Sequence, residues 1–235
     1  MKWLCDWIFP PRCVICTEVL ALEERQGELC EGCRSKIPFI PKEICPHCGG
    51  QTEIAGFCEF CRKSFAFETA CAAFPYETVR HAIHLFKYEG GKAIGEGLGR
   101  LLAQYLQEIH PQRLSETDVL LSVPLHPKKE KKRGFDQTQI LCDQIRKATG
   151  IPMERLLERK RNTVAQSSLS SPEERRKNLK DAFAVTGAVE GKRILLVDDI
   201  LTTGSTCNEC AKVLLRSGAE RVDVCCLAAA GLQIK

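Results

Sequence analysis

The stretch Arg193-Ile-Leu-Leu-Val-Asp-Asp-Ile-Leu-Thr-Thr-Gly-Ser-Thr206 lies near the C-terminal end of the 235-residue sequence. It begins with the apolar run 194–197, which is typical of a buried strand in a parallel sheet. Two adjacent carboxylates, Asp198 and Asp199, follow this run. Open α/β sheets bind their ligands at the carboxyl ends of the strands, where these acids are expected. A loop of small residues and a helical pattern come next, so the stretch predicts a strand, a loop and a helix around a binding site.

The loop consists of Thr202, Thr203, Gly204, Ser205 and Thr206. It offers backbone N–H groups, hydroxyls and a helix N-terminus, all of which bind anions. Glycine allows the backbone to come close to a phosphate, because no Cβ atom stands in the way. Two acids beside an anion site suit the hydroxyl groups of a sugar. The stretch therefore predicts a site for a phosphorylated sugar.

Two other interpretations of this stretch are weaker. The sequence Leu-Val-Asp-Asp also opens response-regulator receiver domains, in which acids bind Mg²⁺ and accept a phosphoryl group. A receiver needs a full α/β domain after that strand, and only residues 200–235 follow here. The other interpretation is a simple helix N-terminus with capping side chains. Capping accounts for Thr202 and Thr203 but leaves two acids at the end of a buried strand without a purpose.

Length and charge limit the possible classes of protein. A chain of 235 residues is long enough for one α/β domain with its own core and a smaller module. The net charge of +4 argues only weakly for an anionic partner. The cations are concentrated, however, with five in residues 128–133 and six more in residues 159–161 and 175–177. Such clusters are usually solvated faces, so they give a modest indication of phosphate or nucleic acid binding.

Cysteine is the most unusual feature of the composition. Fifteen cysteines are present, and nine of them lie in the first 61 residues. Eight of these nine form four Cys-x-x-Cys pairs, enough for two tetrahedral zinc sites of the structural, ribbon type. We predict that the pairs combine in sequence order, the alternative being a crossed arrangement. In that order the first site contains Cys13, Cys16, Cys30 and Cys33, and the second contains Cys45, Cys48, Cys58 and Cys61.

The sequence shows no recognisable signal peptide and no membrane-spanning segment. Residues 1–9 are apolar but few, Asp6 interrupts them, and Pro10 and Pro11 end them. No apolar stretch is long enough to span a bilayer. We therefore expect a cytoplasmic protein with reduced thiols, in which paired cysteines indicate metal ligands rather than disulfides.

After the cysteine-rich part, strand and helix patterns alternate. Strand patterns lie at 71–76, 118–123, 193–199 and 221–227, and helical patterns at 78–86, 94–109, 135–148 and 205–217. The segments 87–91 and 128–133 are predicted as loops. This alternation predicts an α/β fold, with a parallel sheet flanked by helices. We place the boundary between a zinc-ribbon module, 1–64, and this domain, 65–235, where the composition changes near Ser64.

Several segments occur in an order that resembles the ComF family. They are Phe86-Lys-Tyr-Glu-Gly90, Val123-Pro-Leu-His126, Arg133-Gly-Phe-Asp-Gln137, Arg161-Asn-Thr-Val-Ala-Gln166, Arg176-Lys-Asn178 and Val197-Asp-Asp-Ile-Leu-Thr-Thr-Gly-Ser-Thr206. The last is similar to the motif that binds 5-phosphoribosyl 1-pyrophosphate (PRPP) in type I phosphoribosyltransferases. ComF proteins are amidophosphoribosyltransferase-like, carry N-terminal zinc ribbons and are linked with natural competence. The resemblance covers nearly the entire chain and implies a type I phosphoribosyltransferase-like fold.

The resemblance also implies roles for individual residues. Asp198 and Asp199 would bind the ribose hydroxyls, directly or through Mg²⁺, and the loop 202–206 would hold the 5′-phosphate. Lys87 would contact the pyrophosphate as a point charge, and the planar guanidinium of Arg133 suits phosphate. The family usually has asparagine where this chain has Asp136, and an ionised carboxylate cannot donate a hydrogen bond to phosphate.

As to function, the resemblance implies a PRPP-binding protein that supports DNA uptake and natural transformation. Its partners would be single-stranded DNA and proteins of the competence machinery, and zinc ribbons and basic segments suit contact with a nucleic acid backbone. The alternative is an active phosphoribosyltransferase that uses PRPP and Mg²⁺. The sequence does not declare an acceptor for that reaction.

Overall fold

A computed structural model defines the fold for residues 10–25, 27–36, 39–48, 52, 58, 61, 63–89, 91–161 and 181–230. Within these residues, a five-stranded sheet with parallel neighbours forms the centre of the molecule. The strand order is β1 (Ala70–Pro75), β7 (Arg221–Ala229), β6 (Arg193–Leu201), β2 (Val119–Ser122) and β3 (Met153–Glu154). The predicted parallel sheet and its four predicted strands are confirmed, and β3 adds a short edge strand.

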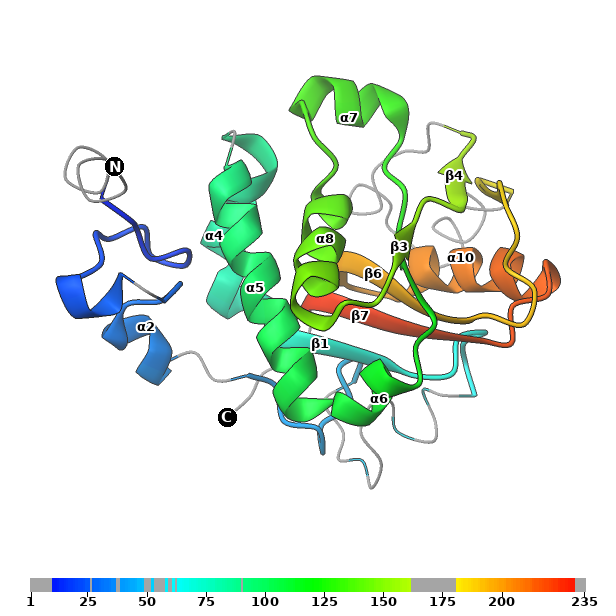
Figure 1. Cartoon of the computed structure of the whole chain (residues 1–235), viewed down its shortest axis with the longest axis horizontal. Helices are drawn as coiled ribbons and strands as arrows, with labels where there is room; N and C mark the ends of the chain where they lie inside the picture. Colours follow the sequence, from blue (N-terminus) through cyan, green and yellow to red (C-terminus); the bar gives the residue numbers. More distant parts are fainter. Residues whose placement is uncertain are drawn as a thin grey trace.

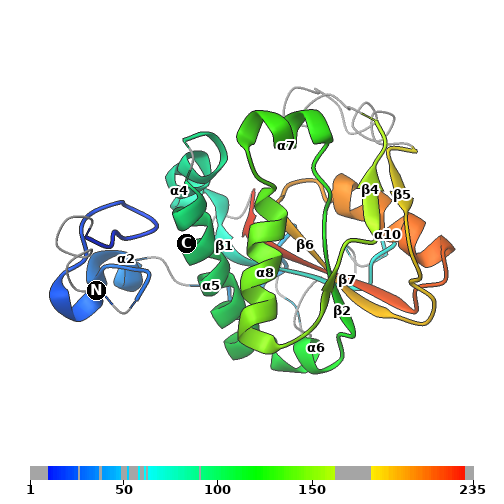
Figure 2. The ribbon, with the colours of Figure 1, turned by 45° about the horizontal axis from the view of Figure 1, so that its top comes forward.

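Helices cover both faces of the sheet (Figures 1 and 2). The helices α4 (Tyr76–Tyr88), α5 (Lys92–Ile109) and α8 (Gln137–Thr149) lie on one face, and α10 (Ser205–Arg216) lies on the other. Because successive residues of a strand point to opposite faces, Leu195 packs in the core with Leu102 of α5 while Leu196 packs with Leu214 of α10. The predicted parallel sheet flanked by helices is therefore confirmed.

Shorter elements complete the described chain. They are the 3-10 helix η1 (Leu22–Glu24) and the helix α2 (Glu31–Lys36) in the cysteine-rich part, the helices α6 (Pro111–Ser115) and α7 (Pro127–Arg133), and the strands β4 (Leu157–Arg159) and β5 (Phe183–Val185). The strands β4 and β5 form an antiparallel pair that packs beside α10. This pair and α7 stand at the same end of the sheet in Figure 2.

Two segments that were predicted as loops are wholly or partly helical. The basic segment 128–133 belongs to α7, because Pro127 suits the first helical turn and the side chain of His126 accepts a hydrogen bond from the Lys128 backbone N–H. Gly134 ends this helix with a φ of 82°. Lys87 likewise lies in the last turn of α4 rather than in a flexible loop. The basic side chains of 128–133 and the side chain of Lys87 therefore extend from helices rather than from loops.

The cysteine-rich part shares cores with both faces of the sheet. Ile40 and Cys61 pack with the residues under α10, whereas Cys13 and Val14 pack with the residues of α4 and α5. On α5, a Cβ atom at Gly97 would lie 2.3 Å from Val14 Cγ1, so only glycine allows this close approach. The proposed boundary at residue 64 thus separates two parts that pack against each other.

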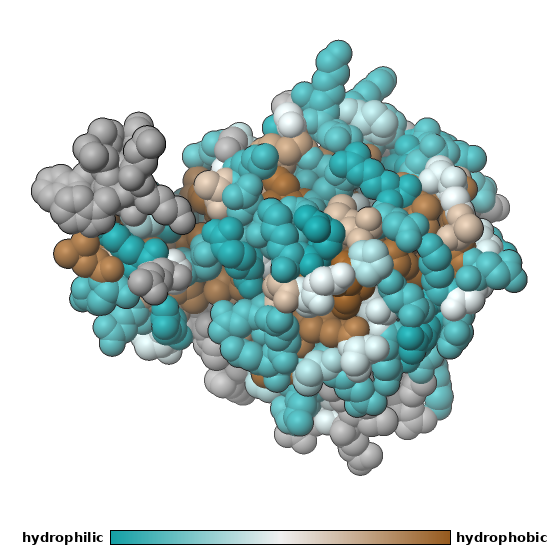
Figure 3. All heavy atoms as spheres, viewed as in Figure 1, coloured by the Kyte–Doolittle hydropathy of each residue, from teal (hydrophilic) through white to brown (hydrophobic). Residues whose placement is uncertain are grey.

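The surface in the view of Figure 3 is mostly hydrophilic, with apolar atoms confined to smaller patches. Three large hydrophobic residues among those described are exposed, namely Val19, Leu22 and Tyr88. In the described part of the chain, no helix combines the length and the apolar character that crossing a membrane requires.

Candidate functional site

A cavity of about 260 Å³ opens at the carboxyl ends of β2 and β6, and we call it the phosphate-loop site. The segments that directly follow β2 and β6 contribute to its lining, because the carboxyl ends of parallel strands meet at one edge of the sheet. Of the predicted residues, it brings together Lys87, Arg133, Asp198, Asp199, Thr202 and Thr206. The other predicted loop residues, Thr203, Gly204 and Ser205, form the turn between Thr202 and Thr206 and do not line the cavity.

The two adjacent acids differ in their surroundings. The Asp199 backbone N–H donates to Asp198 Oδ1 at 2.8 Å, and the Cys207 thiol lies 3.5 Å from Asp198 Oδ2 as a donor. Burial, and then the charge of Asp199, raise the pKa of Asp198 to about 7. The pKa of Asp198 therefore lies well above that of an ordinary aspartate.

Lys87 is the cation closest to these acids. Its Nζ lies 2.5 Å from Asp199 Oδ2, and the two side chains are only 15% and 19% exposed. The neighbouring Phe86 is buried and stacks on Phe135, with ring centroids 5.8 Å apart, which joins the end of α4 to the segment before α8. The fold therefore places Lys87 next to the acid pair, from the last turn of a helix rather than from the predicted loop.

The loop after β6 has the geometry of a tight turn into a helix. Gly204 has a φ of 69° and is the N-cap residue of α10, a backbone conformation that other residues rarely adopt. A Cβ atom at this position would also lie 2.8 Å from Phe65 Cε1. Next to it, the Thr203 and Ser205 hydroxyl oxygens are 2.9 Å apart and share a hydrogen bond. The turn therefore brings Thr202, Thr206 and the start of a helix to the cavity, and a helix N-terminus suits an anion.

Three further cations surround the cavity. Arg133 lies with its Cζ 5.3 Å from the centre of the Tyr88 ring, and Lys129 and Arg159 line the same wall. Burial, followed by the charges of Arg159 and Arg133, lowers the pKa of Lys129. The sequence alone did not place Lys129 or Arg159 in the site, because a run of basic residues does not show which of them faces inward. The periodicity of α7 is the signal that would have found Lys129, which lies one turn before Arg133, whereas Arg159 belongs to β4.

Asp136 lines the cavity and also caps the helix α8. It is the N-cap residue of α8, and its Oδ1 accepts hydrogen bonds from the Thr138 backbone N–H at 3.0 Å, the Thr138 hydroxyl at 2.7 Å and the Gln139 backbone N–H at 3.3 Å. Its Oδ2 faces the Leu125 backbone N–H at 3.4 Å. A carboxylate supplies all these acceptors without a donor, which explains why aspartate is suited to the position.

Gln137, the last residue of the motif 133–137, is a site residue for which the sequence alone indicated no role. It is 2% exposed, lines the cavity, and accepts a hydrogen bond from Arg133 Nη1 at 2.6 Å through Oε1. Its Nε2 is buried and has no acceptor among the described residues. A buried amide donor at a cavity wall is well placed for a ligand oxygen.

The remaining motif residues are only partly covered by the structure. Arg161 is described and follows β4. Thr163, Gln166, Arg176 and Asn178, which the family resemblance singles out, lie outside the described residues.

The eight predicted zinc ligands form two groups of four, Cys13, Cys16, Cys30 and Cys33, and Cys45, Cys48, Cys58 and Cys61. This is the pairing in sequence order. Within each group the sulfur atoms lie within 4.8 Å of one another, with Cys16 and Cys30 at 3.7 Å and Cys48 and Cys58 at 3.7 Å. A tetrahedral ion with Zn–S bonds of about 2.3 Å needs sulfur atoms about 3.8 Å apart, so both groups fit Zn²⁺.

The second cysteine group is connected to the phosphate-loop site. His47 Nδ1 lies 3.3 Å from Cys61 Sγ, and the His47 ring meets the Phe65 ring edge-on at 5.3 Å. Phe65 in turn touches Gly204, and the Ala66 backbone N–H donates to Asn208 Oδ1 at 2.7 Å at the start of α10. The second cysteine group is therefore linked to the loop at Gly204 through His47 and Phe65.

Comparison with known proteins also finds a cysteine-rich, zinc-binding part next to a ligand-binding α/β domain. Residues 4–72 match the family described as a double zinc ribbon domain, and residues 88–234 match the phosphoribosyl transferase domain. "DNA utilization protein YhgH" of Escherichia coli O157:H7 is 33% identical over 225 residues, covering 93% of this chain and 96% of that protein. "Competence protein F" of Haemophilus influenzae is 31% identical, covering 93% and 97%. "Competence protein ComFC" of Bacillus subtilis is 27% identical, covering 92% and 88%.

Among solved structures, the "allosteric regulatory enzyme of purine biosynthesis" is 26% identical over 57% of this chain and 26% of that chain, with a TM-score of 0.40. This overlap is partial, and the assignment rests on the sequence matches. The fold and the cysteine groups define a protein with a phosphoribosyltransferase domain and a double zinc ribbon. The chain belongs to the ComF family, together with the competence and DNA utilization proteins named above.

Proposed function

We propose that the phosphate-loop site binds PRPP, or another phosphoribosyl ligand, together with Mg²⁺. The observation that carries this proposal is the convergence of an acid pair, a phosphate-type loop and four cations on one cavity. Carboxylate oxygens suit Mg²⁺, and lysine and arginine suit phosphate. In this assignment Thr202 to Thr206 hold the 5′-phosphate, Asp198 and Asp199 hold the ribose hydroxyls, and Lys87 and Arg133 hold the pyrophosphate.

For the biological role, we propose that the protein supports DNA uptake and natural transformation in the cytoplasm by binding single-stranded DNA. Two relatives carry the name competence protein, which supports this role. The helix α7 supports it physically, because Lys128 and Lys131 are exposed on this helix, which also contributes to the site. Contacts of this kind bind a nucleic acid backbone without reading its sequence. Proteins of the competence machinery are the expected partners.

One observation favours catalysis as the second candidate function. Asp198 lines the cavity, where its carboxylate can accept a proton from an attacking group. In such a reaction the bond between C1 of the ribose and the pyrophosphate oxygen breaks and pyrophosphate leaves. A nucleophile forms the new bond to C1, and its proton passes to the carboxylate. Positioning and charge stabilisation by Lys87 and Arg133 would supply most of the rate enhancement.

Calorimetric titration of the zinc-loaded protein with PRPP in the presence of Mg²⁺ tests the ligand. Binding is expected for the natural sequence and lost when Asp198→Asn and Asp199→Asn are combined. The pair Lys128→Gln and Lys131→Gln is the matched control, because both side chains are exposed beside the site. PRPP binding that survives the loss of both acids contradicts the assignment, and pyrophosphate release assayed in parallel separates catalysis from binding.

Single-stranded DNA binding is tested with the same variants. The affinity of the natural sequence is expected to fall steeply with salt, and the Lys128→Gln and Lys131→Gln pair should weaken binding and flatten that slope. Transformation efficiency of each variant, measured at equal protein abundance, then shows which property the cell uses. Transformation that is unaffected by both pairs of changes rules out the proposed role.

A further inference from the structure

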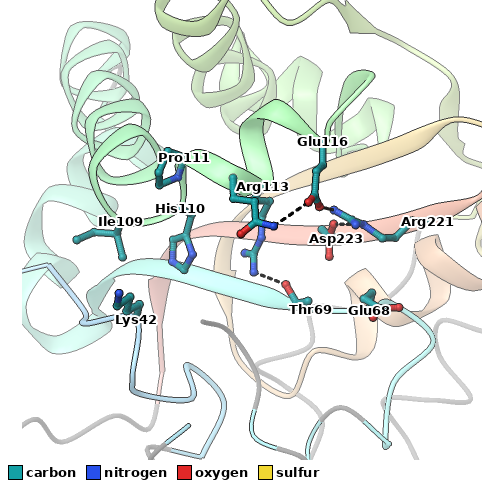
Figure 4. Close-up of a pocket in the computed structure, with 11 residues that line it drawn as sticks. Lys42, Glu68, Thr69, Ile109, His110, Pro111, Arg113, Glu116, Arg221 and Asp223 are labelled. Atoms are coloured by element: carbon teal, nitrogen blue, oxygen red, sulfur yellow. Dashed lines mark hydrogen bonds and ion pairs between the residues drawn. The ribbon is translucent and has the colours of Figure 1, made fainter. Parts of the chain in front are cut away.

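A second cavity, of about 410 Å³, lies at the opposite end of the sheet, and we call it the amino-end pocket (Figure 4). It opens where β1 and β7 begin and where α5 passes into α6. Its size is within the range of small-molecule sites in proteins. None of its residues lines the phosphate-loop site, so the mechanism proposed above leaves it unused. Its central residues are Thr69, Ile109, His110, Arg113, Arg221 and Asp223.

The charges around the amino-end pocket balance. Three cations, Lys42, Arg113 and Arg221, and three acids, Glu68, Glu116 and Asp223, line it. Arg221 is already neutralised, with its Nη2 2.8 Å from Glu116 Oε2 and its Nε 2.7 Å from Asp223 Oδ2. A ligand with a large net charge of either sign gains little from such a lining. The inside of the pocket therefore favours a neutral polar group.

Two buried groups give the pocket a specific pattern of donors and acceptors. Asp223 is 3% exposed, and its Oδ1 accepts no hydrogen bond from any described residue. Arg113 is 8% exposed, and its Nη2 donates to the Thr69 hydroxyl at the cavity wall. A buried carboxylate oxygen without a donor is costly, so a ligand N–H that reaches it gains a strong, charge-assisted hydrogen bond.

The surroundings of Asp223 restrict the kind of N–H group. The guanidinium group of Arg113 lies beside Asp223 and repels an ammonium group, whereas a neutral N–H is not repelled. An acceptor atom beside that N–H can face Arg113. Ile109 and Pro111 add apolar surface from the end of α5 and the start of α6, which suits a flat ring.

We propose that the amino-end pocket binds a nucleobase, which presents a ring N–H or amino group to Asp223 and the neighbouring acceptor atom to Arg113. Lys42 is exposed at the rim and belongs to the segment that leads into the second cysteine group, so a nucleotide phosphate has a cation available there. The occupant is a free base, a nucleoside or a nucleoside monophosphate, all of which share the recognised edge. This inference does not depend on PRPP binding at the other end of the sheet.

Calorimetric titration of the full-length, zinc-loaded protein tests the proposal, with uracil, hypoxanthine and adenine as probes and their nucleosides and monophosphates as separate arms. At least one base should bind, and 1,3-dimethyluracil, which has the same ring without an N–H donor, should not. Asp223→Asn should weaken binding at least about tenfold, the usual effect of losing a hydrogen bond to a charged group. Asp118→Asn is the matched control, because Asp118 lies at the same end of the sheet but pairs with Arg193 outside the pocket.

A second variant guards against an effect of Asp223→Asn on folding. Ile109→Trp fills the cavity while Asp223 stays in place, and thermal unfolding of both variants is compared with the natural sequence. Loss of base binding in both variants supports the proposal. Absence of binding by every base at millimolar concentration overturns it, as does binding that tolerates both changes. Binding that is lost on combining Asp198→Asn with Asp199→Asn, and not on changing the pocket, assigns the base to the phosphate-loop site and likewise overturns it.

Discussion

The ion pair between Lys87 and Asp199 offers the most direct measurement of how the phosphate-loop site is held together. Fully exposed ion pairs contribute about 0–1 kcal/mol, and removal of one partner from a fully buried pair costs about 3–5 kcal/mol. With an N–O distance of 2.5 Å and side chains 15% and 19% exposed, this pair lies between these cases. We expect a coupling free energy of about 2 kcal/mol in a double-mutant cycle.

The cycle consists of Lys87→Met, Asp199→Asn and the double variant, with the free energy of unfolding measured by urea denaturation in the presence of zinc. Lys87→Met should be the more costly single change, because it leaves two adjacent carboxylates without their cation. Asp199→Asn should cost less, since Lys87 then faces Asp198 alone. In the double variant, most of the loss caused by Lys87→Met should be absent.

Lys92→Met is the control, because Lys92 is exposed at the start of the next helix. The same Lys87 variant should also bind PRPP about 10- to 100-fold more weakly, as expected for a lost contact to a charged group. Unfolding free energies that add within about 0.5 kcal/mol would refute the ion pair as an energetic contact. Unchanged PRPP affinity would remove Lys87 from the binding site.

Three further predictions follow from contacts elsewhere. Asp136→Ala should lower the free energy of unfolding by about 1–2 kcal/mol through loss of the α8 cap, whereas Asp136→Asn, which keeps one acceptor, should cost less in the same denaturation assay. Phe65→Ala should lower PRPP affinity while metal analysis shows an unchanged zinc content, and removal of zinc by a chelator should lower both PRPP affinity and the melting temperature. Burial, and then the charge of Arg113, lower the pKa of His110 from 6.5 to about 3. Since the unfolded chain takes up that proton first, the free energy of unfolding should fall by about 2 kcal/mol between pH 6.5 and pH 5. A His110→Gln variant should lack this part of the pH dependence, and equal pH profiles for the two proteins would contradict the prediction.

Much of the fold followed from local sequence patterns. The apolar run 194–197 had the character of a strand buried on both faces, and it became β6 at the centre of the sheet. The four strands and four helices expected from periodicity are present. The segment 128–133 was predicted as a loop because its residues are nearly all charged, so that no apolar period marks it as helical. Pro127 and Gly134, at its two ends, were the signals for a helix.

The sequence by itself determined the chemistry of this protein, because acids at a strand end, a glycine-containing anion loop and paired cysteines are local features. Which residues meet was decided only by the tertiary structure. Lys129 and Arg159 come from separate elements and reach one cavity because α7 and β4 stand at the same end of the sheet. The second cysteine group reaches the loop at Gly204 through Phe65, a contact between residues about 140 positions apart whose existence depends on packing. The amino-end pocket is of the same kind, because Lys42, Arg113 and Asp223 share no local pattern and are neighbours only where the strands begin.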